Sequence, residues 1–502
     1  MSKSLLTILL LLSLAGLAAS QPTPSEKGRE IYVSRCSWCH GREGRGDGPA
    51  AEFLNPPPRD FTLGVYKWKS TPFDEITPSE DDFVRMIKGV ASHDGIQGWA
   101  GMNGTSMPGW NDTLSDGEIK ALTGYIKGFG QLEKAEKPSI DTSVVKPSRE
   151  GVERGRGLYK DRCSECHGED GRGNGRKRLK DDWGARTWPR DLTKGWTFRA
   201  GSSAKDIYTR VTVGIPGTQM PSFADPKSSK RLTDEQRRDV ADYAASLNEA
   251  YRKPGAGDTI RAVRVEGDLP QSPDDAAWSK AAYANFYLFP QIIAKERLYK
   301  PTLDSVSVKS LYNDSNIAVL MEWDDPTRSV PGDEKAAELA EGEVFADAVA
   351  VQFPAGKELP YFGMGDERPV DIWHWRSEGG EGLPQPIRLI RAKGFKNISE
   401  ADTAPSGISA KGVYEKGRWR VVFMGPLTGA GKEAGQMDNP IPAAFAAWDG
   451  SNGDRGSRHV LTGWKTITLE RKTKGGYFWA VVIALFVFAA ELVWLRSAGK
   501  SA

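Results

Sequence analysis

The sequence predicts a multidomain protein with two all-α domains, then a mostly-β sandwich domain, and then one C-terminal transmembrane helix. Three observations predict this order: a duplicated cysteine–histidine motif, a strand-like pattern from about residue 260, and an apolar run near the end of the chain. At 502 residues the chain exceeds what one hydrophobic core usually organises. The formal net charge of +2 gives no reason to expect a nucleic acid as partner.

The first residues are typical of an export signal. Lys3 supplies a positive start, residues 5–17 an apolar run, and residues 18–20 a small-residue cleavage site. We therefore expect a signal peptide over residues 1–20 and a protein on the exported, periplasmic side. The run is short for a membrane span, and an uncleaved N-terminal anchor is the alternative.

Residues 477–495 are apolar apart from Glu491, and this length is close to the roughly 20 residues that a spanning helix needs. Tyr477, Trp479 and Trp494 lie near the two ends, where aromatic rings favour the membrane interface. We expect a transmembrane helix over 477–495 that anchors the exported domains. A buried core helix is the alternative.

The cysteine–histidine motif belongs to an internal repeat. Glycine-rich loops follow it at 41–48 and 168–175, and a Pro-Arg-Asp segment recurs at 58–60 and 189–191. Helices are expected before the two motifs, over 26–35 and 152–162, and at the end of each unit, over 119–129 and 240–247, after capping residues. The repeat predicts one domain over 21–132, a linker over 133–150 and a second domain over 151–250.

The two motifs have the spacing Cys-x-x-Cys-His, which is typical of covalent haem c attachment. The thiols add to the haem vinyl groups, and the adjacent histidine coordinates the iron. The predicted haem-binding cysteines are Cys36, Cys39, Cys163 and Cys166, and the predicted iron ligands are His40 and His167. A zinc site or a thioredoxin-like redox pair is the alternative, but two such motifs with glycine-rich loops favour haem.

A second iron ligand is expected on a downstream loop. Met107 and Met220 each precede a proline, and a methionine thioether raises the reduction potential of haem iron. Met102 and His93 are rivals in the first unit. These motifs resemble tandem class I cytochromes c over residues 25 to about 250, and the resemblance implies two all-α cytochrome c domains.

The region 258–470 reads as short strands separated by turns, which favours a β-sandwich. Hairpins are expected from residues 305–311 with 317–323 and from residues 413–414 with 419–424. Apolar residues alternate around Val351, and residues 464–469 are expected to form the last strand.

Three stretches of this region, at 360–366, 370–375 and 443–450, resemble the haem-b-binding domain of gamma subunits from ethylbenzene dehydrogenase, dimethyl sulfide dehydrogenase and related molybdenum enzymes. The resemblance implies a β-sandwich that holds one non-covalent haem b between a methionine and a lysine. Met364 matches the methionine, and His459 stands where the lysine is expected. Lys465 and Met424 are alternative ligands. His374 lies between two tryptophans and is expected to be structural or to line the pocket.

The predicted function is electron relay by two haems c and one haem b, with no catalytic residues in this chain. The resemblance implies a molybdopterin-type catalytic subunit and an iron–sulfur subunit as partners, with other cytochromes or quinone-linked carriers of the respiratory chain, and a nitrite oxidoreductase-like assembly is the leading hypothesis. One alternative is a free-standing dihaem membrane cytochrome with a haem-free docking domain. The other is a haem peroxidase-like enzyme, which needs an open position on the iron.

Overall fold

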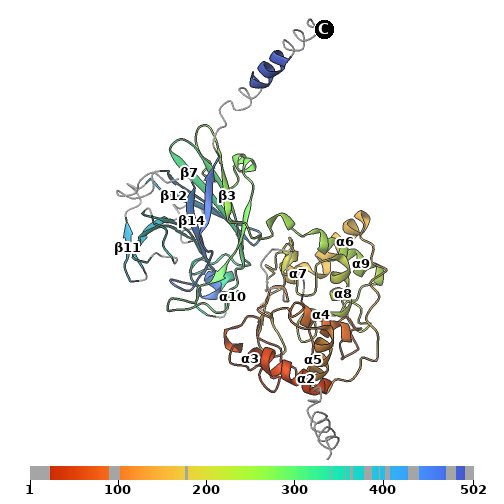
Figure 1. The fold of residues 1–502 in the computed structure, drawn as a ribbon. Helices are drawn as coiled ribbons and strands as arrows, with labels where there is room; N and C mark the ends of the chain where they lie inside the picture. Colours follow the sequence, from red (N-terminus) through yellow and green to blue (C-terminus); the bar gives the residue numbers. More distant parts are fainter. Residues whose placement is uncertain are drawn as a thin grey trace, which may run out of the picture.

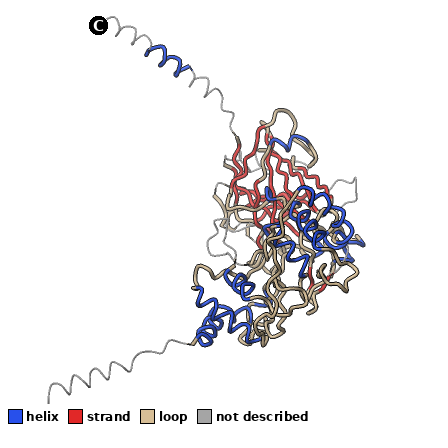
Figure 2. The backbone as a smooth tube through the Cα atoms, turned by 90° about the vertical axis from the view of Figure 1, so that its right-hand side faces the viewer, coloured by secondary structure: helices blue, strands red, loops and turns tan. Residues whose placement is uncertain are grey.

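The computed structural model describes residues 23–89, 102–175, 179–340, 342–356, 358–361, 366–377, 387–394, 396–401, 407–427, 440–470 and 482–491. The predicted signal peptide, His93 and Met364 lie outside these residues. Two helical domains and a β domain make up the body of the molecule (Figure 1). In the turned view the strands gather in one part of the body, and helices and long loops form the rest (Figure 2).

The first helical domain confirms the expected helices around the motif. Helix α2 (Pro24–Ile31) continues through a π-helical turn, η1 (Tyr32–Cys36), into the single turn α3 (Ser37–His40). The remaining helices are η2 (Ala51–Phe53), α4 (Glu80–Lys88) and α5 (Asp116–Phe129). Helix α5 begins with the capping box of Ser115 and Glu118 that the sequence predicted.

The second helical domain repeats this plan. Its elements are α6 (Arg149–Arg162), α7 (Ser164–His167), β1 (Leu179–Lys180), β2 (Arg186–Thr187), η3 (Gly195–Thr197), α8 (Ala204–Val213) and α9 (Asp234–Ser246). Helix α9 begins with the predicted capping box of Thr233 and Gln236. The short helix η4 (Ala250–Arg252) then leads into the β domain.

In each helical domain the first and last helices cross in direct backbone contact. A Cβ atom on Gly28 of α2 would lie 2.3 Å from the carbonyl oxygen of Ala121 in α5. A Cβ on Gly155 of α6 would lie 2.0 Å from the carbonyl oxygen of Asp239 in α9. Glycine is therefore required at both crossings, because any side chain would push the helices apart.

The β domain contains fourteen of the named strands. These are β3 (Thr259–Arg264), β4 (Ala284–Tyr287), β5 (Phe289–Pro290), β6 (Ser305–Tyr312), β7 (Asn316–Asp324), β8 (Ala348–Pro354), β9 (Val370–Arg376), β10 (Ile387–Ala392), β11 (Ile398–Ala401), β12 (Ser409–Glu415), β13 (Arg418–Pro426), β14 (Ile441–Trp448), β15 (Val460–Leu461) and β16 (Lys465–Leu469). Three short helices accompany them, η5 (Ala276–Lys280), α10 (Glu334–Leu339) and η7 (Gly450–Asn452). Both predicted hairpins are confirmed, as the antiparallel pairs β6–β7 and β12–β13.

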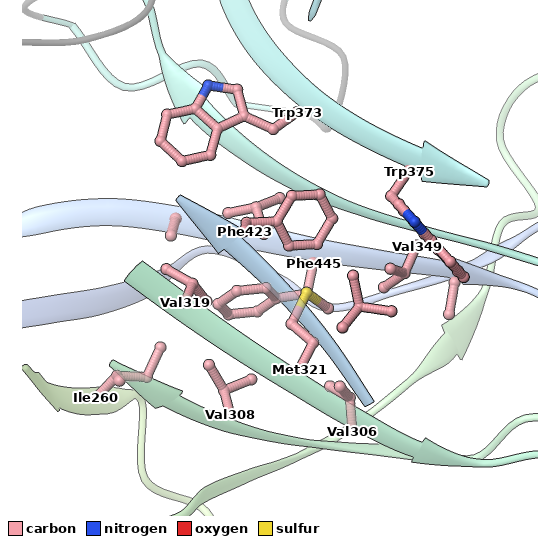
Figure 3. Close-up of a cluster of buried hydrophobic side chains, with 14 of the residues drawn as sticks. Ile260, Val306, Val308, Val319, Met321, Val349, Trp373, Trp375, Phe423 and Phe445 are labelled. Carbon is pink, nitrogen blue, oxygen red and sulfur yellow. The ribbon is translucent and has the colours of Figure 1, made fainter. Parts of the chain in front are cut away.

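Strand β14 joins the two sheets of the sandwich. Its first residues, Ile441 to Ala443, pair with β16, and its last residues, Ala444 to Trp448, pair with β8. The order along the path is β11-β10-β9-β8-β14-β16-β3-β6-β7-β13-β12. The inward side chains of both sheets form one core, in which Trp373, Trp375 and Phe445 face Met321 and Phe423 (Figure 3). The predicted β-sandwich is therefore confirmed.

The predicted transmembrane helix over 477–495 is wrong. Within the described ranges no helix is both long enough and apolar enough to cross a bilayer. The helix described in this region covers residues 482–491.

The helix crossing in the second domain gives a direct test. Gly155→Ala should lower the free energy of unfolding by about 1 to 3 kcal/mol, because the new methyl group overlaps the backbone of α9. Gly157→Ala is the matched control, since nothing lies within 4 Å of its added Cβ. Denaturant unfolding of both variants measures the difference. Equal stabilities would contradict the close crossing.

Candidate functional site

In each helical domain the two cysteines of the motif lie on one helical turn. Cys36 ends η1 and Cys39 lies in α3, while Cys163 caps α6 and Cys166 lies in α7. All four thiols are free of disulfides, and burial raises the pKa values of Cys36 and Cys163 to about 12. In each domain the two free thiols therefore lie close together, directly before the histidine.

The histidine that follows each pair is held in the same way in both domains. His40 Nδ1 lies 3.0 Å from the carbonyl oxygen of Arg59, and His167 Nδ1 lies 3.0 Å from that of Arg190. Enclosure by protein atoms lowers the pKa of both imidazoles. A neutral ring that donates from Nδ1 has only Nε2 left for a metal, the usual arrangement of an iron-ligating histidine.

A tyrosine anchors the start of each glycine-rich loop. The Tyr32 hydroxyl donates to the carbonyl of Gly41 at 2.7 Å, and the Tyr159 hydroxyl donates to that of Gly168 at 2.8 Å. Both tyrosines are buried on the helix that precedes the cysteine pair. The hydrogen bond fixes the backbone directly after the histidine.

The predicted methionine loops are also related by the repeat. In the first domain the Met102 amide donates to the Met107 carbonyl at 3.2 Å, and the Met107 amide donates to the Thr105 hydroxyl at 3.2 Å. In the second domain the Ile215 amide likewise donates to the Met220 carbonyl, at 3.0 Å. Met107 thus occupies the position of Met220, whereas Met102 occupies that of an isoleucine that cannot ligate iron. This equivalence favours Met107 over its rival.

The helices that carry these loops were missed in the sequence. The Trp110 amide donates to Ile87 of α4 at 3.1 Å, and the Phe223 amide donates to Val211 of α8 at 3.0 Å. Both helices begin with a capping box, Ser79 with Asp82 and Ser203 with Asp206. The Ser-x-x-Asp spacing was the signal that could have revealed them.

Half-buried arginines lie where the two helical domains meet. Burial and, to a smaller extent, the neighbouring charges of Arg190 and Arg59 together lower the pKa of Arg199 to about 9. The Nε atoms of Arg199 and Arg210 are buried, and no described residue hydrogen bonds to them. Buried guanidinium groups normally pair with anions. A haem carries two propionate groups, so these arginines fit a haem edge at this boundary.

The β domain brings two histidines to one tryptophan. The ring of Trp448 lies 5.1 Å from the ring of His374 and 4.7 Å from that of His459. Because Trp373 and Trp375 point into the core, His374 lies on the opposite face of the sheet. Burial lowers the pKa of His374 to about 3 and that of His459 to about 4, so both rings are neutral.

This outer face has the character of a cofactor surface. His459 Nδ1 lies 3.1 Å from the carbonyl oxygen of Gly456, and His374 Nδ1 is buried without a hydrogen-bond partner in the described part of the chain. Small and aliphatic side chains cover the neighbouring strands, among them Ala350, Val370, Ile372 and Ala392. Trp464 donates to the carbonyl of Pro360 at 2.8 Å, which brings the chain just before residues 362–365 to this face. The surface fits a flat apolar group with one histidine ligand.

The alternative ligands Lys465 and Met424 lie elsewhere. The Lys465 ammonium pairs with Asp258 and lies 5.0 Å above the ring of Phe286. Met424 packs against a separate cluster that contains Trp278. The structure therefore does not bring either side chain to His459.

A buried charge network joins the second helical domain to the β domain. Asp324, at the end of β7, pairs with Arg252 at 2.9 Å, with Arg418 at 2.8 Å and with Lys194 at 3.3 Å. Arg418 also pairs with Glu249 at 2.6 Å. Burial raises the pKa of Asp324, but the three cations outweigh burial and hold the pKa well below its usual range.

The network ends at the loops around His167. Lys194 comes three residues after the Pro-Arg-Asp segment whose arginine carbonyl holds His167, and Arg172 belongs to the glycine-rich loop after His167. Arg172 pairs with Glu249 at 2.9 Å. The second cysteine–histidine site is thus fastened to the β domain by ion pairs with little exposure to solvent.

Comparison with known families divides the chain in the same way. The cbb3-type cytochrome c oxidase subunit III model matches residues 23–126, and the cytochrome c model matches residues 152–248. The ethylbenzene dehydrogenase model matches residues 275–386.

Similar proteins include subunits of respiratory reductases. The chlorate reductase gamma subunit of Ideonella dechloratans is 28% identical over 224 residues, which are 43% of this chain and 84% of that protein. A heme subunit ascribed to the respiratory nitrate reductase of Haloferax mediterranei is 25% identical over 251 residues, 48% of this chain and 84% of that protein. A chain from a reducing HAO-like protein complex of Kuenenia stuttgartiensis is 33% identical, with a TM-score of 0.38, over 45% of this chain and 96% of its own.

The charge network predicts a pH-dependent fold. Asp324→Asn should lower the free energy of unfolding by about 3 to 5 kcal/mol at neutral pH, because three buried cations lose their shared anion. In the unchanged protein this contribution is complete above about pH 4, the ordinary pKa of an aspartate, and is lost as the pH falls further. Denaturant unfolding between pH 3 and 7 measures both effects. Asp314→Asn is the control, since Asp314 pairs with Arg264 at the surface; an equal loss in both variants would contradict the role of the network.

Proposed function

We propose that this chain, which joins two cytochrome c domains to a domain of the ethylbenzene dehydrogenase family, is the electron-transfer haem subunit of a molybdenum-type oxidoreductase complex. It relays electrons between the catalytic subunit and the respiratory chain and makes no bonds itself. One observation carries the proposal: both cysteine–histidine turns hold the histidine through Nδ1 to an arginine carbonyl at 3.0 Å.

In this proposal the two helical domains each hold one haem c. The cysteines Cys36, Cys39, Cys163 and Cys166 form the thioether links, and His40 and His167 provide one iron ligand each. Met107 and Met220 provide the other. A haem iron with two fixed protein ligands takes up and releases single electrons with little rearrangement. The tyrosine and carbonyl hydrogen bonds keep these side chains in place in both oxidation states.

The arginines at the boundary of the helical domains receive the propionates. Arg59 and Arg190 each present a backbone carbonyl to a histidine, and both belong to the cluster around Arg199. Their positive charge stabilises the reduced state, because reduction adds one negative charge nearby. The cluster therefore tunes both sites together.

The β domain holds a haem b on the outer face of the sheet of β8, β9 and β14. His459 is one iron ligand. Met364, which lies outside the described residues, is the second ligand. His374 and Trp448 line the same surface. The charge network around Asp324 keeps this domain against the second cytochrome c domain, so that electrons pass between fixed sites.

The partner follows from the relatives, whose names describe subunits of chlorate and nitrate reductases. We infer a molybdopterin-type catalytic subunit with an iron–sulfur subunit, and other cytochromes or quinone-linked carriers as exchange partners. The haem domains function on the exported side of the membrane, and a nitrite oxidoreductase-like complex is the leading assignment.

The choice between Met107 and Met102 can be measured. Met107→Ala should lower the reduction potential of one haem c by about 100 mV or more and should open it to carbon monoxide, because the thioether ligand is lost. Met102→Ala should leave both properties unchanged. Potentiometric titration and difference spectra with carbon monoxide report the two effects. The rival assignment would be correct if Met102→Ala caused the change.

Purification from native membranes tests the whole function. The pyridine haemochrome assay should give two haems c for each haem b, and a molybdenum-containing subunit should co-purify. His459→Ala should lose the haem b alone, and Met424→Leu is the matched control that keeps all three. A preparation with two haems c and no haem b would reduce the β domain to a docking module, and reproducible absence of molybdenum would contradict the complex.

A further inference from the structure

Three carboxylates meet inside the β domain, away from the haem surface. Asp325 follows β7, Asp347 precedes β8 and Asp449 follows β14, so the ends of three strands converge on them. All three residues have no exposed surface. One oxygen of each lies within 4.8 Å of the oxygens of the other two.

The group has no compensating positive side chain in the described part of the chain. No lysine or arginine there forms an ion pair with Asp325, Asp347 or Asp449. Asp454 is a fourth buried acid, and its Oδ2 accepts from the Asp449 amide at 3.2 Å. Burial and mutual repulsion raise the pKa values of Asp325 and Asp347 well above the usual range. Such a group is costly unless a cation or protons neutralise it.

Two of the carboxylates are held as acceptors. Asp347 Oδ1 accepts from the Gly450 amide at 2.8 Å, and Oδ2 accepts from the Ser329 amide at 2.6 Å and from the Trp419 indole at 2.9 Å. Asp449 Oδ1 accepts from the Ser451 amide at 2.9 Å. All these donors are neutral. They orient the two side chains and stabilise their charged form without cancelling the charge.

A buried oxygen of Asp325 is independent evidence for a bound ligand. Asp325 Oδ1 accepts from the Thr327 amide at 3.0 Å, but Asp325 Oδ2 is buried and has no hydrogen-bond partner among the residues that the structure describes. A fully buried carboxylate oxygen without a donor is rare in native structures and calls for an explanation. Here the neighbouring groups are carboxylates, which accept and do not donate.

We propose that Asp325, Asp347 and Asp449 bind a calcium ion. Calcium takes oxygen ligands at about 2.3 to 2.6 Å, so oxygens around one ion lie at most about 5 Å apart. The separation within 4.8 Å satisfies this limit. The donor set is entirely oxygen, without the nitrogen or sulfur that transition metals favour. The double positive charge explains how three carboxylates share a dry interior.

The ion fixes a loop of the β domain that contacts the first cytochrome c domain. Thr302 donates to Asp449 Oδ2 at 2.5 Å, which ties the preceding loop to the site. On that loop the ring of Tyr299 lies 4.8 Å from the ring of Phe53, and the carbonyl of Pro301 accepts from Asn55 at 3.5 Å. Calcium therefore holds the loop on which the first domain rests.

Thermal denaturation of the full-length haem-loaded protein tests the site. Calcium in large excess over its dissociation constant should raise Tm by about 5 to 10 °C relative to chelator-treated protein. Metal analysis after gel filtration should find about one calcium per chain. Asp325→Asn should abolish both results and should keep or raise Tm in chelator, because it removes a repelling charge. Asp314→Asn, at an exposed position, is the matched control that keeps the calcium response.

Each outcome decides the proposal. A calcium response that is lost in Asp325→Asn and Asp347→Asn but kept in the control supports it. It is overturned if the unchanged protein holds no metal and shows no calcium response, or if the response survives both substitutions. A larger response to magnesium overturns the assignment of the ion. Haem content, measured in parallel, is expected to stay the same, which separates this test from the proposed electron-transfer function.

Discussion

The orientation of two imidazole rings is the constraint on which the candidate sites depend. His40 and His167 each hydrogen bond through Nδ1 to a backbone carbonyl, and a backbone acceptor cannot rotate away as a side chain can. That carbonyl belongs to an arginine, Arg59 or Arg190, in a Pro-Arg-Asp segment. The aspartate at the end of each segment accepts from the amide two residues on, at 2.9 Å in both domains. This hydrogen bond fixes the loop that presents the carbonyl.

The same segments lead to the contacts between domains. The arginine side chains enter the cationic cluster where the two helical domains meet, and Lys194, just beyond the second segment, reaches Asp324 in the β domain. A change in the position of one loop would therefore disturb a proposed iron ligand and a domain contact together. Electron transfer between fixed sites benefits from this coupling, because it limits relative motion of the domains.

The inward faces, one outward face and the strand ends of the β domain have different roles. The inward faces of the sheets form an aromatic core, and one outward face carries His374, Trp448 and His459. The strand ends at Asp325 and Asp449 gather acidic groups that the core could not tolerate without neutralisation. Apolar packing alone therefore stabilises the centre of the sandwich, while its ends depend on charge compensation.

The sequence by itself determined what short-range spacing encodes. Two thiols and a histidine on one turn, a capping box at Ser115, and alternation along β8 are local patterns, and each produced the expected element. The apolar run at 477–495 misled for the same reason: composition predicted a span, whereas no helix in the described part of the chain is long and apolar enough to cross a bilayer. Tertiary structure decided the contacts between distant positions. It gave Met107 and Met220 equivalent loop positions, brought His374 and His459 to the same tryptophan, and placed Asp325, Asp347 and Asp449 together at the ends of three strands. No local pattern specifies such contacts, because they form only when whole sheets and domains pack against one another.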